Sequence, residues 1–155
     1  FIFQGFNLFP TLTVGENVEL ALDLKGIRGG RARVEAQRLL EQVELAHKYN
    51  TFPSDLSGGQ KQRVAVARAL AGSPELILAD EPTAALDSHT GRTVMELMRS
   101  LAHTHGRAVV VVTHDSRVLE FGDRIVRMED GRMVEPVVAV HPAVYAGMEA
   151  EALHR

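Results

Sequence analysis

The most informative segment of this 155-residue chain is Leu56-Ser57-Gly58-Gly59-Gln60, which continues into an alanine-rich run over residues 61–70. Ser57 and Gln60 have the S-x-x-Q spacing of a capping box, so a helix is predicted to begin here. The two glycines lack a Cβ atom and let a bulky anion approach the backbone of the first turn. The unpaired N–H groups and the positive dipole end of that turn favour phosphate. The same residues can also be a purely structural cap, and the rest of the sequence has to decide.

A short apolar run, Leu76 to Ala79, follows this helix and ends in two adjacent carboxylates, Asp80 and Glu81. The run is too short for a helix and comes after Gly72-Ser73-Pro74, so it is predicted to be a buried strand. In open parallel α/β sheets, ligands bind outside the carboxyl ends of the strands. Since successive strand residues point to opposite faces, one carboxylate can hold Mg²⁺ while the other orients or deprotonates a water. The alternative is a solvated acidic turn.

A second apolar strand is predicted over residues 108–113, where four consecutive valines indicate that helices cover both faces. The strand is followed by His114, which is therefore expected at the same edge of the sheet as Asp80 and Glu81. A single histidine is most often a structural or surface residue, and the chain has seven. Position alone distinguishes His114 from the others.

Five segments resemble, in order and spacing, the Q-loop, signature motif, Walker B motif, D-loop and switch histidine of the nucleotide-binding domain of ABC transporters. They are Gln4, Leu56–Gln60, Leu76–Glu81, Ala84–Asp87 and His114. The resemblance covers Phe1 to about Glu135. It implies an α/β fold, a partial P-loop NTPase (RecA-like) parallel sheet with an inserted helical subdomain that carries the signature motif.

Finer similarities point to one branch of that family. The stretches 3–9 and 13–18 are similar to the lipoprotein-release and macrolide-export branch, and residues 79–87 with 128–132 to its DevA-type members. The predicted organisation is a helical subdomain at about residues 10–71 and an α/β core at about 1–9 and 72–135. Residues 136–155 are expected to form a C-terminal tail.

One expected motif does not occur in the sequence. Family members carry a phosphate-binding loop, G-x-x-x-x-G-K-[ST], before the Q-loop, and this chain contains none. We therefore expect an N-terminally truncated fragment whose P-loop lies before residue 1 and which binds ATP weakly or not at all by itself. A core that is short of strands is also expected to expose a sheet edge and to aggregate.

The resemblance implies that ATP, with Mg²⁺, is bound between two subunits packed head to tail. The signature residues of one subunit would contact the γ-phosphate of the other, the second carboxylate would be the general base, and the switch histidine would contact both. The implied catalytic residues are Glu81, His114 and Gln4; the nucleotide-binding residues are Ser57, Gly58, Gly59, Gln60 and Asp87; the metal residues are Asp80 and Gln4.

The implied function is that of the ATP-hydrolysing subunit of an exporter. Its partners would be a second nucleotide-binding subunit, an integral membrane permease at the cytoplasmic face of the membrane, and a periplasmic adaptor. The large apolar residues Phe6, Leu8, Phe9 and Leu12 either pack inside the helical subdomain or line a groove for a permease helix.

Composition limits the remaining possibilities. A net charge of −3 without a long basic run argues against nucleic acid as a partner, and the absence of cysteine excludes disulfides and Cys-ligated zinc. The interval between Gln4 and Ser57 has no room for the coiled coil of DNA-directed relatives. Two alternatives stay open, a soluble ribosome-associated ABC-type ATPase and a non-catalytic remnant.

Overall fold

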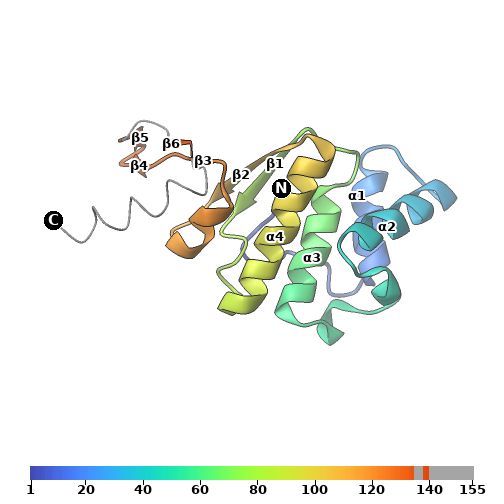
Figure 1. Ribbon diagram of the computed structural model, residues 1–155. Helices are drawn as coiled ribbons and strands as arrows, with labels where there is room; N and C mark the ends of the chain where they lie inside the picture. The colour runs from blue at the N-terminus through green and yellow to red at the C-terminus, as the bar shows by residue number, and fades with distance from the viewer. Residues whose placement is uncertain (135–137, 140–155) are drawn as a thin grey trace. The chain divides into compact units, whose positions relative to one another are not determined.

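The computed structural model describes residues 1–134 and 138–139, which belong to two compact units, residues 1–114 and residues 115–155. Figure 1 shows the first unit as a group of helices beside a short sheet. In chain order its elements are α1 (Val14–Asp23), α2 (Gly30–Gln42), the 3-10 helices η1 (Ala46–Lys48) and η2 (Pro53–Asp55), α3 (Gly58–Ala69), β1 (Leu76–Asp80), α4 (Ser88–His105) and β2 (Ala108–Val112).

The strands of the first unit run parallel. β1 and β2 pair over their whole lengths. On the other side of β1, the backbone N–H of Ile2 donates to the carbonyl of Leu78 at 2.8 Å, and that of Asp80 donates to the carbonyl of Ile2 at 2.9 Å. The segment around Ile2 therefore lies parallel to β1 as a third segment of the sheet, and β1 is in the middle. The predicted parallel α/β fold is confirmed.

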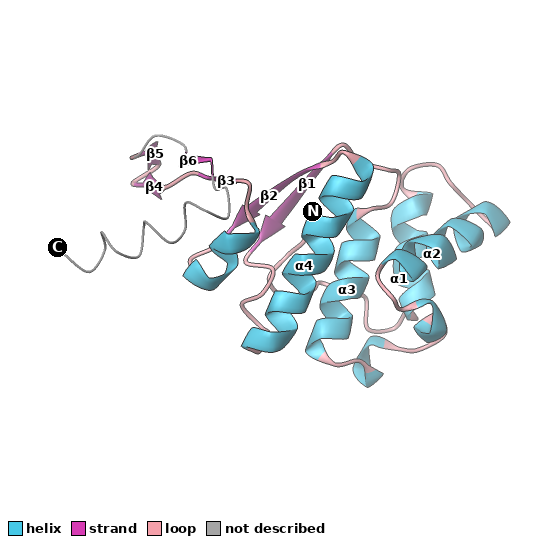
Figure 2. Cartoon of the chain, in the orientation of Figure 1, coloured by secondary structure: helices cyan, strands magenta, loops and turns pink. Residues whose placement is uncertain are grey.

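Helix α1 begins after Thr13, where the T-x-x-E spacing of Thr13 and Glu16 in the sequence predicts a capping box. At the start of α1, the hydroxyl of Thr13 accepts the N–H of Glu16 at 3.3 Å, and the Glu16 carboxylate accepts the N–H of Thr13 at 2.7 Å. These two bonds make the predicted capping box. Helix α1 packs on α2 and α3, and α3 packs on α4, which also contacts β2. Figure 2 shows α3 and α4 running side by side.

The two faces of the sheet have different environments. Ile77 and Ala79 of β1 are buried, whereas Leu76 and Leu78 on the opposite face are 51% and 40% exposed. In β2, Val110 and Val112 are also exposed. The prediction that helices cover both faces of the valine-rich strand is therefore wrong for this chain. Among residues 1–134 and 138–139, helix α4 contacts β2, and the face that carries Val110 and Val112 is exposed. The expected exposure of the sheet therefore extends beyond its edge.

The second unit contains η3 (Ser116–Phe121) and four short strands, β3 (Arg124–Ile125), β4 (Met128–Glu129), β5 (Arg132–Met133) and β6 (Val138–Ala139). The Asp130-Gly131 dipeptide predicts a hairpin turn, and β4 and β5 form that hairpin. The φ values of the two residues are 47° and 75°. Positive φ at both central residues is typical of a type I′ hairpin turn.

The sequence over residues 124–128 predicts a single strand, and the structure interrupts it. Its first half, β3, pairs with β6, while β4 pairs with β5, so the two halves have different partners and cannot form one strand. The predicted tail at 136–155 lies outside the described residues except for the two residues of β6. Among the residues that the structure describes, no helix is long and apolar enough to cross a membrane.

Candidate functional site

Polar residues gather at the carboxyl edge of the sheet in the first unit. Gln4 follows the Ile2 segment, Asp80 and Glu81 stand at the end of β1, and His114 follows β2. Because the three segments are parallel, their carboxyl ends meet at one edge, which is the place where α/β sheets bind ligands. The structure thus brings four of the predicted site residues to one edge.

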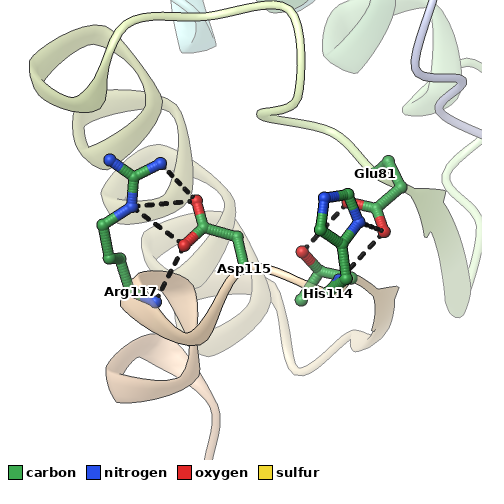
Figure 3. A network of polar contacts seen from close by, with 5 residues as sticks. Glu81, His114, Asp115 and Arg117 are labelled. Atoms are coloured by element: carbon green, nitrogen blue, oxygen red, sulfur yellow. Dashed lines mark hydrogen bonds and ion pairs between the residues drawn. The ribbon is translucent and has the colours of Figure 1, made fainter.

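The Glu81 carboxylate is held by groups from the end of β2. Its Oε1 lies 2.6 Å from Nδ1 of His114 and accepts the backbone N–H of His114 at 2.9 Å. Its Oε2 accepts the hydroxyl of Thr113 at 3.1 Å. Figure 3 shows the Glu81 and His114 side chains pointing toward each other. The carboxylate is only 16% exposed while the imidazole is 84% exposed, so the histidine is the member of the pair that is open to a ligand.

The backbone of Glu81 has an unusual conformation for a side chain of its kind. Its φ is 47°, in the left-handed region, which costs an L residue about 1–2 kcal/mol. Its N–H donates to the carbonyl of Val112 at 2.9 Å, and its carbonyl accepts the N–H of Ala84 at 3.2 Å. Such conformations persist where surrounding contacts hold them, and they concentrate at functional sites. The turn directs the Glu81 side chain toward β2.

Asp80 and Gln4 have the donor chemistry that Mg²⁺ prefers. Both side chains are exposed, and both present oxygen ligands at the carboxyl edge of the sheet. Within residues 1–134 and 138–139, no three acidic, histidine or cysteine side chains form a group that could hold a metal ion alone. Mg²⁺ commonly binds through one or two carboxylates, waters and substrate phosphates. The residues present therefore fit a metal that arrives with a nucleotide.

The first turn of α3 has both a cap and close packing. The Ser57 hydroxyl accepts the N–H of Gln60 at 3.3 Å, and Oε1 of Gln60 accepts the N–H of Ser57 at 3.0 Å, which confirms the capping box. A Cβ atom added at Gly59 would lie 2.3 Å from Cγ2 of Thr90 in α4. One of the two glycines thus has a packing role that the sequence did not indicate. Ser57 itself is exposed, so a ligand can still reach this turn.

The segment that resembles the D-loop lies close to this turn. A Cβ atom at Gly58 would lie 3.2 Å from Cδ2 of Leu86, in the segment that resembles the D-loop. Asp87 ends that segment and caps α4, because its Oδ1 accepts the N–H of Thr90 at 3.0 Å. This hydrogen bonding lowers the pKa of the Asp87 carboxyl. The carboxylate is exposed.

Sequence reasoning did not assign a role to Thr113. Its hydroxyl is one of the groups that fix Glu81, and its only signal in the sequence is its place beside His114 at the end of the valine-rich strand. A threonine at a strand end is too common to be noticed without the position of the carboxylate.

The chain belongs to the ABC transporter family, whose model matches residues 1–84. An uncharacterized ABC transporter ATP-binding protein of Methanocaldococcus jannaschii, MJ0796, is 51% identical over 137 residues, which are 86% of this chain and 58% of that protein. A macrolide export ATP-binding/permease protein, MacB of Aggregatibacter actinomycetemcomitans, is 46% identical over 134 residues, 86% of this chain and 21% of that protein. The predicted family is confirmed, and the MacB relative agrees with the predicted likeness to the macrolide-export branch. The DevA-type assignment stays a prediction.

Solved structures agree with this assignment. The dimeric ATP-binding cassette MJ0796 in a post-hydrolysis state, bound to ADP and Pi, matches with a TM-score of 0.76 and 49% identity. The match covers 90% of this chain and 62% of that chain. The chain therefore spans less than two thirds of the length of the cassettes it matches.

Proposed function

We propose that this chain carries the Q-loop, signature, Walker B and switch-histidine part of an ATP-hydrolysing subunit of an ABC exporter. The observation that carries the proposal is the contact between Glu81 and His114 at the carboxyl edge of a parallel sheet. Glu81 directly follows Asp80 in the sequence. A cassette 49% identical to this chain is a dimer in its structure with ADP and Pi. That relative supports hydrolysis between two subunits.

In this proposal Glu81 is the general base. Its carboxylate orients a water against the γ-phosphate and takes the water's proton, while the bond from the γ-phosphorus to the bridging oxygen breaks. Thr113 and His114 aim the carboxylate, since each donates to one of its oxygens. The exposed imidazole of His114 contacts the γ-phosphate.

Asp80 and Gln4 would hold Mg²⁺ beside the nucleotide. The metal, when bound, offsets charge on the phosphate oxygens. Both side chains are exposed at the edge where the phosphates would lie.

The first turn of α3 binds the nucleotide of the second subunit. Its N–H groups and dipole favour phosphate, and Ser57 keeps its hydroxyl exposed. This chain contains no phosphate-binding loop of its own, so the proposal needs such a loop facing Ser57 and Gly58. The Asp87 side chain contacts the second subunit across the interface. Nucleotide then shifts an equilibrium between separated and closed subunits.

A membrane permease is the proposed partner for transport, which places the assembly at the cytoplasmic face of a membrane. Of the apolar residues after Gln4, Phe9 is 49% exposed, whereas Phe6 packs beside Gly58. The Asn17 side chain fixes the Phe9 backbone, accepting its N–H at 2.8 Å and donating to its carbonyl at 3.1 Å. A rigid loop that presents an exposed aromatic ring suits docking. Phe9→Glu should then reduce transport and leave basal ATPase activity unchanged.

A chimeric cassette tests the proposal. The part of the M. jannaschii relative that this chain does not match is joined to this chain, and ATP hydrolysis is measured. The chimera should hydrolyse ATP, and Glu81→Gln should lower kcat by about 100-fold or more, the range for loss of a general base. Glu75→Gln is the matched control, because Glu75 is an exposed carboxylate at the opposite end of β1. Equal activity of the two variants would contradict the proposal.

A further inference from the structure

The segment that follows Gln4 has a backbone conformation that requires external support. Phe6 and Asn7 are consecutive non-glycine residues with φ values of 60° and 49°, in the left-handed region that L side chains rarely adopt. Their N–H groups make short-range turn hydrogen bonds, to the carbonyls of Phe3 at 3.3 Å and Gly5 at 2.6 Å. Conformations of this kind persist where contacts from elsewhere in the fold hold them.

Arg68, in the last turn of α3, supplies such contacts. Its Nη2 donates to the carbonyl of Phe6 at 2.8 Å, and its Nη1 donates to the carbonyl of Asn7. The planar fork of a guanidinium can bond two neighbouring acceptors at once. Burial lowers the pKa of Arg68, because the charged guanidinium is partly desolvated at this position.

The ring of Phe6 lies near the opposite end of the same helix. Its Cζ is 3.9 Å from the position that a Cβ atom would occupy at Gly58, in the first turn of α3. The segment after Gln4 therefore lies beside both ends of α3. Its carbonyls bond Arg68 in the last turn, and its aromatic ring lies beside the turn that carries the signature residues.

We propose that Arg68 is a positioning residue that fixes the segment carrying Gln4 to α3, so that the Q-loop and the signature turn move together. Arg68 acts through the carbonyls of Phe6 and Asn7. The proposal rests on the proposed function, which makes Gln4 and Ser57 parts of one nucleotide-dependent switch. The attachment itself can be measured without nucleotide.

Three variants of this chain separate the possible roles of the guanidinium. Arg68→Gln removes the charge and the fork, while Arg68→Lys keeps the charge but offers a compact ammonium. Arg63→Gln is the matched control, because Arg63 lies on the same helix and donates to the Glu44 carboxylate at 2.6 Å. Loss of the Arg63 guanidinium should leave the hydrogen exchange of the segment after Gln4 unchanged.

Amide hydrogen exchange of the full 155-residue chain, resolved by NMR, is the measurement. In Arg68→Gln the N–H groups of Phe6 and Asn7 should exchange about tenfold faster or more, the factor expected from losing hydrogen bonds to a charged donor. Arg68→Lys should be intermediate. The N–H of Phe9, which donates to Asn17, is an internal reference and should keep its rate. The resonance of Gly58 should shift in Arg68→Gln, shift less in Arg68→Lys and stay in place in Arg63→Gln.

Each other outcome overturns the proposal. Unchanged exchange at Phe6 and Asn7 means that Arg68 does not hold the segment. Equal acceleration at the buried residues Leu39 and Leu40 means that Arg68 only adds to overall stability. An unmoved Gly58 resonance means that the signature turn is independent of the segment. Failure of the proposed function would instead appear as an inactive chimeric cassette with the exchange pattern intact.

Discussion

Close packing of α3 against α4 leads to a prediction about Gly59. Gly→Ala stabilises by about 1 kcal/mol in a helix interior, which is an upper limit for Gly59 in the first turn of α3. Here the new methyl group would lie 2.3 Å from Cγ2 of Thr90, closer than any ordinary contact. Overpacking of this kind costs about 1–3 kcal/mol, so Gly59→Ala should destabilise the chain or, at best, be neutral.

Thr90→Ser provides the matched background, since it removes only the clashing methyl group. The Thr90 Cβ is 3.7 Å from the added atom, which is an ordinary contact. Serine keeps the hydroxyl, and the backbone N–H still donates to Asp87. In this background Gly59→Ala should stabilise the chain by up to about 1 kcal/mol, because only the helix propensity remains.

Urea unfolding of the four proteins in this double-mutant cycle measures the coupling between the two positions. We expect a coupling energy of about 1–3 kcal/mol and a change of sign for Gly59→Ala between the two backgrounds. Additive effects of the two substitutions would contradict this coupling. Gly59 would then have no packing role, and the lack of a Cβ atom at this position would matter only for access of a ligand.

Two further predictions concern stability and solubility. Burial and the Glu19 carboxylate raise the pKa of Tyr49, so its contribution to stability is present below the ordinary pKa of about 10 and is lost as pH rises through the folded value. The free energy of unfolding should therefore fall above pH 10 in the native chain and fall less in Tyr49→Phe, as urea titrations at several pH values would show; equal slopes would count against it. On the open face of the sheet, Val110→Thr with Val112→Thr should raise the monomer fraction in light scattering while thermal stability stays nearly unchanged. An unchanged tendency to associate would mean that another surface causes it.

Local features of this fold could be predicted from the sequence. The capping boxes at Thr13 and Ser57 are set within four residues, and both are present in the structure. β1 and β2 begin and end within a residue or two of the predicted limits, because short apolar runs between breakers have few other solutions. The meeting of Glu81 and His114 at one edge followed from the parallel arrangement.

Features that depend on distant residues could not be predicted. The fit of Gly59 against Thr90 joins two helices, and the reach of Arg68 to Phe6 spans 62 positions of the sequence. The run of valines in β2 indicates burial on both faces, but it does not state which chain segments supply the covering layer, and the helices of the first unit supply only one. The sequence gives no sign of the left-handed turn at Glu81, because glutamate rarely adopts that backbone conformation.

In the proposed assembly two subunits complete each other's nucleotide site, and mixing two variants of the chimeric cassette can detect this. Ser57→Asp keeps a good helix cap but places a negative charge against the phosphate, while Glu81→Gln removes the base. Each variant alone should be inactive. Mixed in equal amounts, they should recover ATP hydrolysis, because random pairing leaves about a quarter of all sites with an intact base from one subunit and an intact signature turn from the other. A mixture as inactive as its components would contradict the account.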